Sequence, residues 1–244
     1  DEKVAQMTQL AGGQITEDFE NQVRAGLGSM LNSMGEEANH YQRIAVEESR
    51  LGIPMIYGRD VIHGHHTAFP VGTALAASFN PELVEESYAA IGREAANNGI
   101  MWCFAPMIDL SHDPRWGRTV EGIGEDPYLA AQTAVQYIKG VQSQGAMACI
   151  KHYAANNQEW DRHHVSSDVD ERTLHEIYLP AFRAAVEEAG VGSLMASYNL
   201  INSVHATENK YLNIEVLRNM WGFEGILMSD WTATYSAINA ANGG

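Results

Sequence analysis

Short hydrophobic, β-prone runs alternate with longer amphipathic stretches along this chain. The short runs predict strands that are buried on both faces, as in a parallel sheet. They cover Gly28–Asn32, Ile53–Tyr57, Met101–Ala105, Ala146–Ile150, Gly192–Ser197 and Gly225–Ser229. Because strands and helical stretches follow one another in turn, repeated right-handed βαβ units are expected.

The stretches between the strands carry signals for the start and the end of helices. Asn80 and Asp126 each precede a proline, the pattern of an N-cap followed by the first helical residue. A kink is expected at Pro180, and Gly222 is expected to end the last of these helices. The predicted helices cover Pro81–Asn97, Pro127–Gln144, Glu171–Ala189 and Asn209–Trp221.

The order of the elements predicts an α/β fold of the barrel type. Six strand–helix units are recognised, and no low-complexity linker divides them. A closed (β/α)8 barrel needs eight such units. We therefore expect a TIM-barrel-like domain over residues 1–244 that is truncated after about six units and belongs to a longer protein. Its unclosed sheet would have free edges, which favour association into a homo-oligomer.

Polar and charged side chains follow the predicted strands closely. They include Asp60, Asp109, Arg118, Lys151, His152, Arg162, Tyr198, Asn199 and Asp230. In parallel α/β sheets the carboxyl ends of the strands form the ligand-binding edge. Polar groups gathered there cost folding free energy unless a ligand, or a network of buried ion pairs, uses them.

Asp230 and Trp231 directly follow the last predicted strand. A carboxylate beside an aromatic ring suits attack on the electrophilic carbon of a sugar, with the ring stacked on the sugar face. The alternative is that Asp230 caps a helix over Trp231–Ala241. In the first interpretation, sugar hydroxyls would be bound by Asp60, Arg118, Lys151, His152 and Arg162.

A metal-dependent hydrolase of the amidohydrolase type is a second chemistry that fits the inventory. Its ligands would come from an H-x-H motif, a lysine, a later histidine and a late aspartate. His63-Gly64-His65, Lys151, His152 and Asp230 match this outline loosely. The spacing is a weak signal in a chain with ten histidines.

Composition narrows the range of partners. Hydrophobic residues make up 45% of the chain, which is ample for a core. Lys and Arg number 15 and Asp and Glu 31, so the formal net charge is −16, which argues against nucleic acids and anionic membranes as partners.

Cys103 and Cys149 lie in hydrophobic runs and are expected to be buried, outside any disulfide or metal site.

Targeting signals are not recognised in the sequence. No stretch reaches the length of a membrane span, and no signal peptide is evident. The chain opens at Asp1-Glu2-Lys3-Val4 as if already inside a helix, so an upstream segment is expected. These residues therefore do not determine the cellular compartment of the protein.

Several motifs resemble, in the same order, those of glycoside hydrolase family 3. The longest is Asp113-Pro114-Arg115-Trp116-Gly117-Arg118, continued by Glu121–Tyr128. The others are Gly58–Gly64, Phe69-Pro70, Lys151–Ala154 and Gly222–Trp231. The resemblance runs over nearly all 244 residues and is greatest to the bacterial β-glucosidase branch.

The resemblance implies a (β/α)8 first domain and a retaining exo-β-glycosidase without a metal or organic cofactor. Asp230 would be the nucleophile and Trp231 would flank the boundary between subsites −1 and +1. Met195 and Tyr198 would line the site near the reactive carbon. The substrate would be a β-glucoside or an oligosaccharide, and a periplasmic or secreted location would be favoured. Subsite −1 would consist of Asp60, Arg118, Lys151, His152 and Arg162.

Two departures from the family pattern bear on activity. Many relatives have an arginine at the position of His66, whose shorter side chain would weaken a hydroxyl contact. The acid of retaining hydrolysis comes, in this branch, from a later α/β-sandwich domain that these residues lack, so the isolated chain is expected to be nearly inactive.

Other activities are compatible with the same motifs. In the hexosaminidase branch a histidine acts as the acid, and His163 and His164 lie at about that position, although the Pro-Gly-His pattern of that branch is missing. A β-xylosidase, a β-N-acetylhexosaminidase and a non-catalytic sugar-binding remnant therefore stay open as alternatives.

Overall fold

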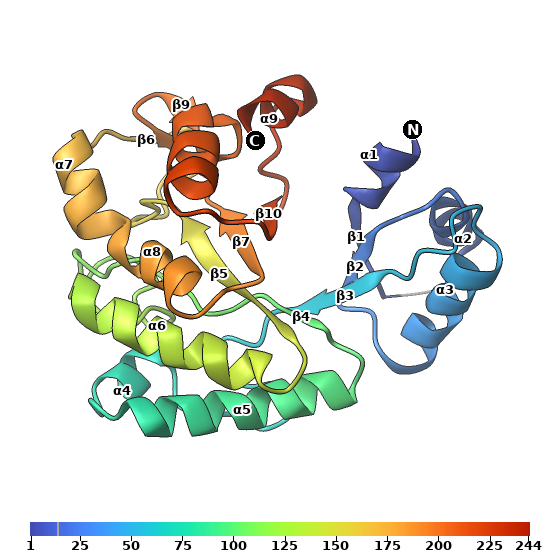
Figure 1. Cartoon of the computed structure of the whole chain (residues 1–244), viewed down its shortest axis with the longest axis horizontal. Helices are drawn as coiled ribbons and strands as arrows, with labels where there is room; N and C mark the ends of the chain where they lie inside the picture. Colours follow the sequence, from blue (N-terminus) through green and yellow to red (C-terminus); the bar gives the residue numbers. More distant parts are fainter. Residues whose placement is uncertain (14) are drawn as a thin grey trace.

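A curled parallel sheet forms the centre of the molecule (Figure 1). The computed structural model describes residues 1–13 and 15–244. Among these residues, seven strands form a sheet in the order β1-β2-β3-β4-β5-β7-β10, which confirms the expected α/β class. The strands are β1 (Gln9–Ala11), β2 (Ser29–Leu31), β3 (Ile56–Arg59), β4 (Trp102–Cys103), β5 (Met147–Tyr153), β7 (Ser193–Ala196) and β10 (Ile226–Ser229).

Helices cover the outer side of this half-barrel (Figure 1). Helices α2 and α3 lie beside the first strands, whereas α5, α6 and α8 lie beside the later ones. The α-helices are α1 (Glu2–Gln6), α2 (Glu17–Arg24), α3 (Gly35–Glu47), α4 (Gly72–Ala76), α5 (Pro81–Asn97), α6 (Pro127–Gln142), α7 (Glu171–Thr173), α8 (Pro180–Glu187) and α9 (Ala237–Gly243). Two segments are π-helices, η1 (Leu174–Tyr178) and η3 (Tyr211–Met220), and one is a short 3-10 helix, η2 (Ala206–Glu208).

The six predicted strands are present, with shifted ends, and β1 was missed. Strand β1 has only three residues and is partly exposed, so it lacks the hydrophobic run that marks the others. Strand β3 begins at Ile56, later than predicted, and Pro54 within the predicted range has no amide hydrogen to donate to a neighbouring strand. A small sheet of β6 (Ser166–Ser167), β8 (Leu200–Ile201) and β9 (Val204–His205) was also not predicted.

Strand β5 runs further than the sequence pattern indicates. It continues through Lys151, His152 and Tyr153, all of them buried, whereas the predicted strand ends before the first charged residue. Charged side chains can be buried when a partner neutralises or hydrogen-bonds them. Here Asp60 and Asp109 are those partners, and they come from distant parts of the sequence.

Helix α5 and the start of α6 agree with their sequence signals. The Asn80 side chain accepts a hydrogen bond from the Leu83 amide at 3.1 Å, and Asp126 does the same for Leu129 at 2.6 Å. The helix predicted around Pro180 is present as α7, η1 and α8, and it is distorted just before the proline as expected, because η1 has the wider hydrogen bonding of a π-helix and a bend at Leu179 follows it.

The predicted helix over Trp231–Ala241 is wrong in its first half. Helix α9 begins only at Ala237, where Ser236 is the N-cap and accepts from the Asn239 amide at 3.3 Å. Asp230 therefore caps no helix, and the alternative interpretation of this carboxylate as an N-cap is wrong.

Two hydrophobic clusters hold the fold together. The larger one fills the layer between the sheet and the helices. The smaller one lies on the sheet itself and consists of Leu31, Trp102, Phe104, Cys149 and Met195. Both cysteines are buried and unpaired, as predicted.

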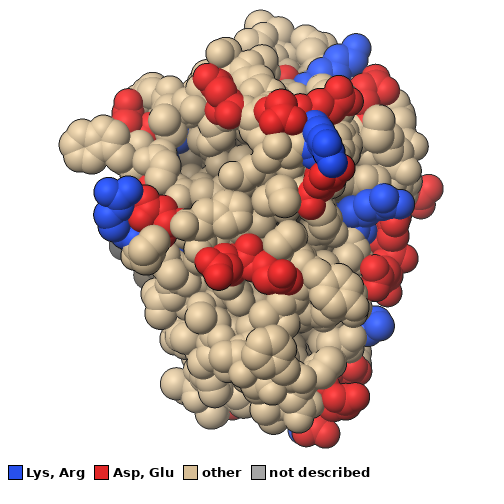
Figure 2. Space-filling model, turned by 90° about the vertical axis from the view of Figure 1, so that its left-hand side faces the viewer, with Lys and Arg blue, Asp and Glu red and all other residues tan. Residues whose placement is uncertain are grey.

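The surface fits the negative net charge of the sequence. Figure 2 shows one face on which acidic side chains are spread among uncharged ones, with a few basic side chains between them. Within the described part of the chain, no helix is both long and apolar enough to span a bilayer.

Candidate active site at the carboxyl ends of the strands

The polar side chains singled out from the sequence come together where neighbouring strands end. Strands β3, β4, β5, β7 and β10 are parallel neighbours, so their carboxyl ends meet at one edge of the sheet. The residues at this edge are Asp60 after β3, Lys151 and His152 in β5, Tyr198 after β7 and Asp230 after β10.

Strand register places Lys151 and Asp230 on the same face. Lys151 is paired with Met195, and Met195 is paired with Met228 on the next strand. Asp230 lies two residues after Met228, and side chains two apart in an extended chain point the same way. The ammonium and the carboxylate are therefore separated by a single intervening strand, β7.

An ion pair joins β5 to the end of β3. The Lys151 ammonium donates to the carboxylate of Asp60. The lysine side chain is only 4% exposed, whereas that of Asp60 is 58% exposed. A buried ammonium is tolerated because it has this partner, and the aspartate still presents carboxylate surface to a ligand.

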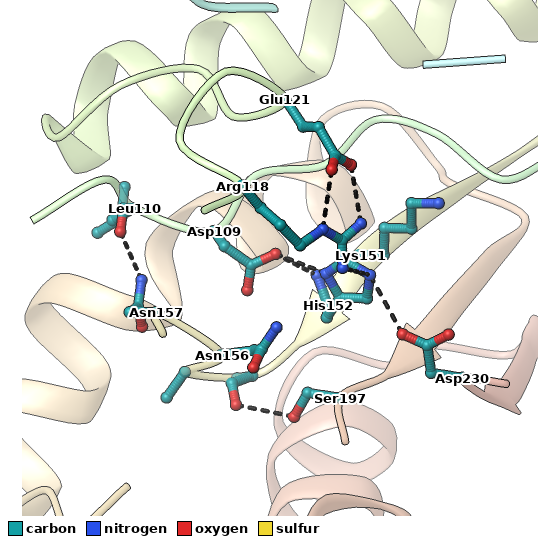
Figure 3. A network of polar contacts seen from close by, with 12 residues as sticks. Asp109, Leu110, Arg118, Glu121, Lys151, His152, Asn156, Asn157, Ser197 and Asp230 are labelled. Atoms are coloured by element: carbon teal, nitrogen blue, oxygen red, sulfur yellow. Dashed lines mark hydrogen bonds and ion pairs between the residues drawn. The ribbon is translucent and has the colours of Figure 1, made fainter. Parts of the chain in front are cut away.

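His152 is the centre of a buried network (Figure 3). Asp109 Oδ2 accepts a hydrogen bond from the His152 amide at 2.9 Å and lies 2.7 Å from its Nδ1. Nη1 of Arg118 lies 3.2 Å from Nε2 on the other side of the ring. Since a guanidinium can only donate, Nε2 must accept and the ring proton must sit on Nδ1.

Burial governs the electrostatics of this pair. Removal from water lowers the pKa of His152 to about 3, so the imidazole is neutral at pH 7. Removal from water also raises the pKa of Asp109 to about 7, although the hydrogen bond from the His152 amide opposes this shift.

Glu121 fixes the orientation of Arg118. Nε and Nη2 of the arginine donate to the two oxygens of Glu121 at 3.0 and 2.8 Å, so Nη1 is left to face His152. Neither Glu121 nor Asp109 was assigned a role from the sequence. The position of Asp109 after a strand was a usable signal, but its burial was not visible in the sequence.

Arg162 reaches the site from the loop after β5. Its guanidinium carbon lies 3.9 Å from the centroid of the Tyr198 ring, and its Nη1 donates to Glu159 at 2.7 Å. Glu159 also accepts from Trp116 Nε1 at 2.8 Å and from Asn156 at 3.3 Å. Glu159 thus ties the loop to the rest of the site, a role that the sequence did not reveal.

Asp230 is held by the backbone and presents an oxygen without a donor. Its amide donates to the Ala196 carbonyl at 3.2 Å, and its Oδ1 accepts from the Trp231 amide at 2.6 Å. Oδ2 is buried, lies 3.3 Å from His152 Nε2, and accepts no hydrogen bond from any residue described in the structure. Burial and the nearby Asp230 carboxylate raise the pKa of the Tyr198 hydroxyl.

Met195 and Trp231 lie at the edges of this arrangement. Met195 is 5% exposed and packs in the smaller hydrophobic cluster. Trp231 is 55% exposed, which leaves its indole available to a ligand. Direct contact of either side chain with a sugar stays a prediction.

The histidines named for the metal alternative do not form a ligand set. His65 packs against His66 with 4.2 Å between ring centroids, and His66 Nε2 lies 3.2 Å from Asn98 Oδ1. Across residues 1–13 and 15–244, no three His, Cys, Asp or Glu side chains are grouped so as to hold a metal ion.

His163 lies beside the Tyr198 ring, whereas His164 is turned toward Asp161. His163 Nδ1 is 2.9 Å from the Tyr235 hydroxyl, and its ring lies 4.6 Å from that of Tyr198. His164 is exposed and pairs with Asp161 at 2.8 Å. A role of either histidine as an acid stays untested.

Known proteins are similar to this chain in both sequence and fold. A β-glucosidase of Rhizobium radiobacter is 44% identical over 218 residues, covering 85% of this chain and 26% of that protein. A periplasmic β-glucosidase of Salmonella typhimurium is 34% identical over 249 residues, covering 98% of this chain and 32% of that protein. The chain thus spans about a quarter to a third of the length of these relatives.

A solved structure matches the whole chain. The β-glucosidase of Listeria innocua in complex with isofagomine superposes with a TM-score of 0.87 at 35% identity, over 100% of this chain and 36% of that one. The barrel-like fold expected from the sequence is therefore confirmed. A profile described as the glycosyl hydrolase family 3 N terminal domain matches residues 1–242, and the chain belongs to that family.

Proposed function

We propose that this chain carries the nucleophile and the sugar-binding subsite of a retaining exo-β-glycosidase of the β-glucosidase type. The observation that carries the proposal is the Asp230 carboxylate, which has an oxygen without a hydrogen-bond donor and stands at the end of β10 beside His152. Membership of the family and the β-glucosidases among its relatives support the same conclusion.

The reaction would proceed in two displacements. A carboxylate oxygen of Asp230 attacks the anomeric carbon, the bond to the leaving oxygen breaks, and an acid protonates that oxygen. Water then attacks the same carbon, gives up a proton to the conjugate base of the acid, and releases Asp230. Two inversions give net retention of configuration.

Subsite −1 would combine donors and acceptors for adjacent sugar hydroxyls. Asp60 accepts from hydroxyls on the side of β3, while Lys151 and Arg118 donate. Arg162 stacks on Tyr198 and keeps further N–H groups for a ligand. None of these roles requires a metal or an organic cofactor.

The acid is assigned to a part of the protein outside this chain. In retaining glycosidases the two carboxyl groups stand roughly 5–5.5 Å apart across the scissile bond. Asp60 is already paired with Lys151, Asp109 is buried behind His152, and Glu121 is paired with Arg118. We therefore expect the acid to be supplied by residues beyond these 244.

Covalent trapping tests the nucleophile without depending on the acid. In 2-deoxy-2-fluoro-β-D-glucosyl fluoride the leaving fluoride needs little protonation, and the 2-fluorine slows release of the glycosyl-enzyme. Mass spectrometry of peptides from the intact gene product should show the label on Asp230, and Asp230→Asn should abolish it. A label on another residue, or undiminished turnover of an aryl β-glucoside by Asp230→Asn, would refute the proposal.

The glycone needs a separate test, because relatives of similar identity differ in it. An exo-α-(1→6)-L-arabinopyranosidase of Bifidobacterium longum is 42% identical over 178 residues. We expect the aryl β-glucoside to be the best substrate in a panel that also contains the β-xyloside, the α-L-arabinopyranoside and the β-N-acetylglucosaminide. Binding of glucose without turnover of any of them would indicate a sugar-binding remnant.

A location outside the cytoplasm is part of the proposal. One relative that matches nearly the whole chain is named a periplasmic β-glucosidase. Cell fractionation of the source organism with an antibody against this chain would check the assignment.

A further inference from the structure

We infer that Asp109 is a positioning residue, which fixes the proton of His152 on Nδ1 and thereby prevents His152 from donating a hydrogen bond to Asp230 Oδ2. This inference rests on the proposed function, in which Asp230 is the nucleophile. Asp109 itself contacts His152 and not the Asp230 carboxylate.

One oxygen of Asp109 accepts two hydrogen bonds from His152. Asp109 Oδ2 accepts from the backbone N–H of His152 and from its Nδ1, at 2.9 and 2.7 Å. Because the backbone N–H can only donate, this oxygen is always presented as an acceptor to the imidazole. Nδ1 therefore has to carry the proton.

Arg118 occupies the opposite side of the His152 ring. With the proton on Nδ1, Nε2 has a lone pair, which the Nη1 group of Arg118 uses at 3.2 Å. Arg118 in turn is oriented by two hydrogen bonds to Glu121. A proton on Nε2 would point at an N–H of the guanidinium, so both neighbours favour the same tautomer.

The tautomer of His152 determines what its Nε2 presents to Asp230. Nε2 lies 3.3 Å from Asp230 Oδ2, and the close approach of the two groups is visible in Figure 3. In the other tautomer this nitrogen would donate to the carboxylate and stabilise its charge before reaction. That charge is lost when the carboxylate becomes an ester, so the ground state would gain more than the transition state and the reaction would slow.

The arrangement also explains an otherwise costly burial. Asp109 is 4% exposed, and its Oδ1 has no hydrogen-bond partner among the residues that the structure describes. A buried carboxyl with one unused oxygen is unfavourable for folding alone. Orientation of His152 beside the nucleophile gives this residue a function that compensates for the cost.

Neutron diffraction tests the tautomer directly. In crystals of the perdeuterated intact gene product, we expect deuterium on His152 Nδ1 and none on Nε2. The variant Asp109→Asn should show the same pattern, because its amide oxygen can take the place of Oδ2. Deuterium on Nε2 in the unmodified protein would overturn the inference, whatever the activity.

Kinetics test the consequence for Asp230. The rate constant for trapping by the 2-fluoroglucosyl fluoride should stay within about tenfold in Asp109→Asn, and should fall about 10²-fold in Asp109→Ala, which leaves both His152 N–H groups without an acceptor. The affinity for the sugar should change much less than the rate constant. Equal rate constants for the two variants would overturn the inference.

A matched control separates positioning from general damage. Ser197→Ala removes another buried hydrogen bond at a strand end, the one to the Ala154 carbonyl at 2.9 Å, without touching His152. Its trapping rate should equal that of the unmodified protein. If the unmodified protein is never trapped, the proposed function fails, while the diffraction result still decides the tautomer.

Discussion

At the scale of single residues, a charged side chain in the site is buried where an oppositely charged partner lies within hydrogen-bonding distance. Lys151 is almost fully buried and depends on Asp60, which is itself largely exposed. Water can therefore solvate Asp60 if its partner is removed, so the pair should matter more for binding a ligand than for folding.

Lys151→Met should weaken sugar binding and leave stability nearly unchanged. The thioether side chain has a similar volume and no charge to desolvate, so the free energy of unfolding should change by less than about 1.5 kcal/mol. Loss of a charged hydrogen bond should raise the Kd for glucose about 10- to 100-fold, as measured by calorimetry. Lys139→Met in the last turn of α6, where the side chain is exposed, should alter neither quantity.

The two members of the buried pair, His152 and Asp109, have opposite effects on how the free energy of unfolding depends on pH. His152 has a pKa of about 3 in the folded state and 6.5 as its ordinary value, so its contribution rises with pH between these values. Asp109 has a pKa of about 7 against an ordinary 3.8, so its contribution falls with pH over much of the same range. The two slopes should largely cancel.

Asp109→Asn should reveal the contribution of His152 to the pH dependence of the free energy of unfolding. Without the carboxyl, the free energy of unfolding should rise with pH between pH 4.5 and 6.5 more steeply than in the unmodified protein, by at most about 1.4 kcal/mol per pH unit. Urea unfolding at several pH values measures this. Asp113→Asn is the control, because Arg115 holds the pKa of Asp113 at about 2, below the window. Parallel curves for Asp109→Asn and the unmodified protein would contradict the assignment.

At the scale of elements, close packing of α5 on α6 supports the strands that present the site. Glycines stand where the two helices touch. A Cβ atom at Gly140 would lie 2.5 Å from the Glu85 carbonyl oxygen, and one at Gly92 would lie 3.0 Å from the Val141 Cα. Backbone atoms of a neighbouring helix move only together with that helix, so neither position has room for a methyl group.

Gly140→Ala should destabilise the fold although alanine is the better helix former. The gain in helix propensity is about 1 kcal/mol, and the overpacking should cost more, about 1–3 kcal/mol beyond that gain. Thermal or denaturant unfolding gives the difference. Gly117→Ala is the matched control, because nothing lies within 4 Å of its added methyl group. An increase in stability for Gly140→Ala would show that the helices are packed less tightly than described.

At the scale of the whole molecule, the half-barrel has two outer strands. In the described sheet β1 pairs only with β2, and β10 pairs only with β7. Ile226 at the start of β10 is 38% exposed. An unpaired strand edge with apolar side chains is a template for pairing with another chain.

The 244-residue chain produced by itself should self-associate through β10. Ile226→Lys should shift it toward the monomer, because a charge on an edge strand opposes pairing with another copy. Analytical ultracentrifugation at several concentrations measures the change. Ile238→Lys in α9, which is 74% exposed but not on the edge, should leave the association unchanged. A monomer at all concentrations would contradict this expectation.

Local sequence signals determined the order and class of the elements. The helix over Pro81–Asn97 was predicted with its observed bounds, because Asn80 and Pro81 act within one helical turn. The later strands were recognised because burial on both faces makes them continuously hydrophobic. The motif from Asp113 to Arg118 and the pair Lys151-His152 indicated the family.

The pairing of the polar residues with one another depends on tertiary contacts. The sequence placed Asp60, Lys151 and Asp230 at strand ends, but pairing of residues far apart in the chain depends on register and on the curl of the sheet. Asp109 and Glu121 show the limit most clearly. Their roles arise from burial and from hydrogen bonds to groups brought close by folding, and neither quantity is encoded in the residues next to them.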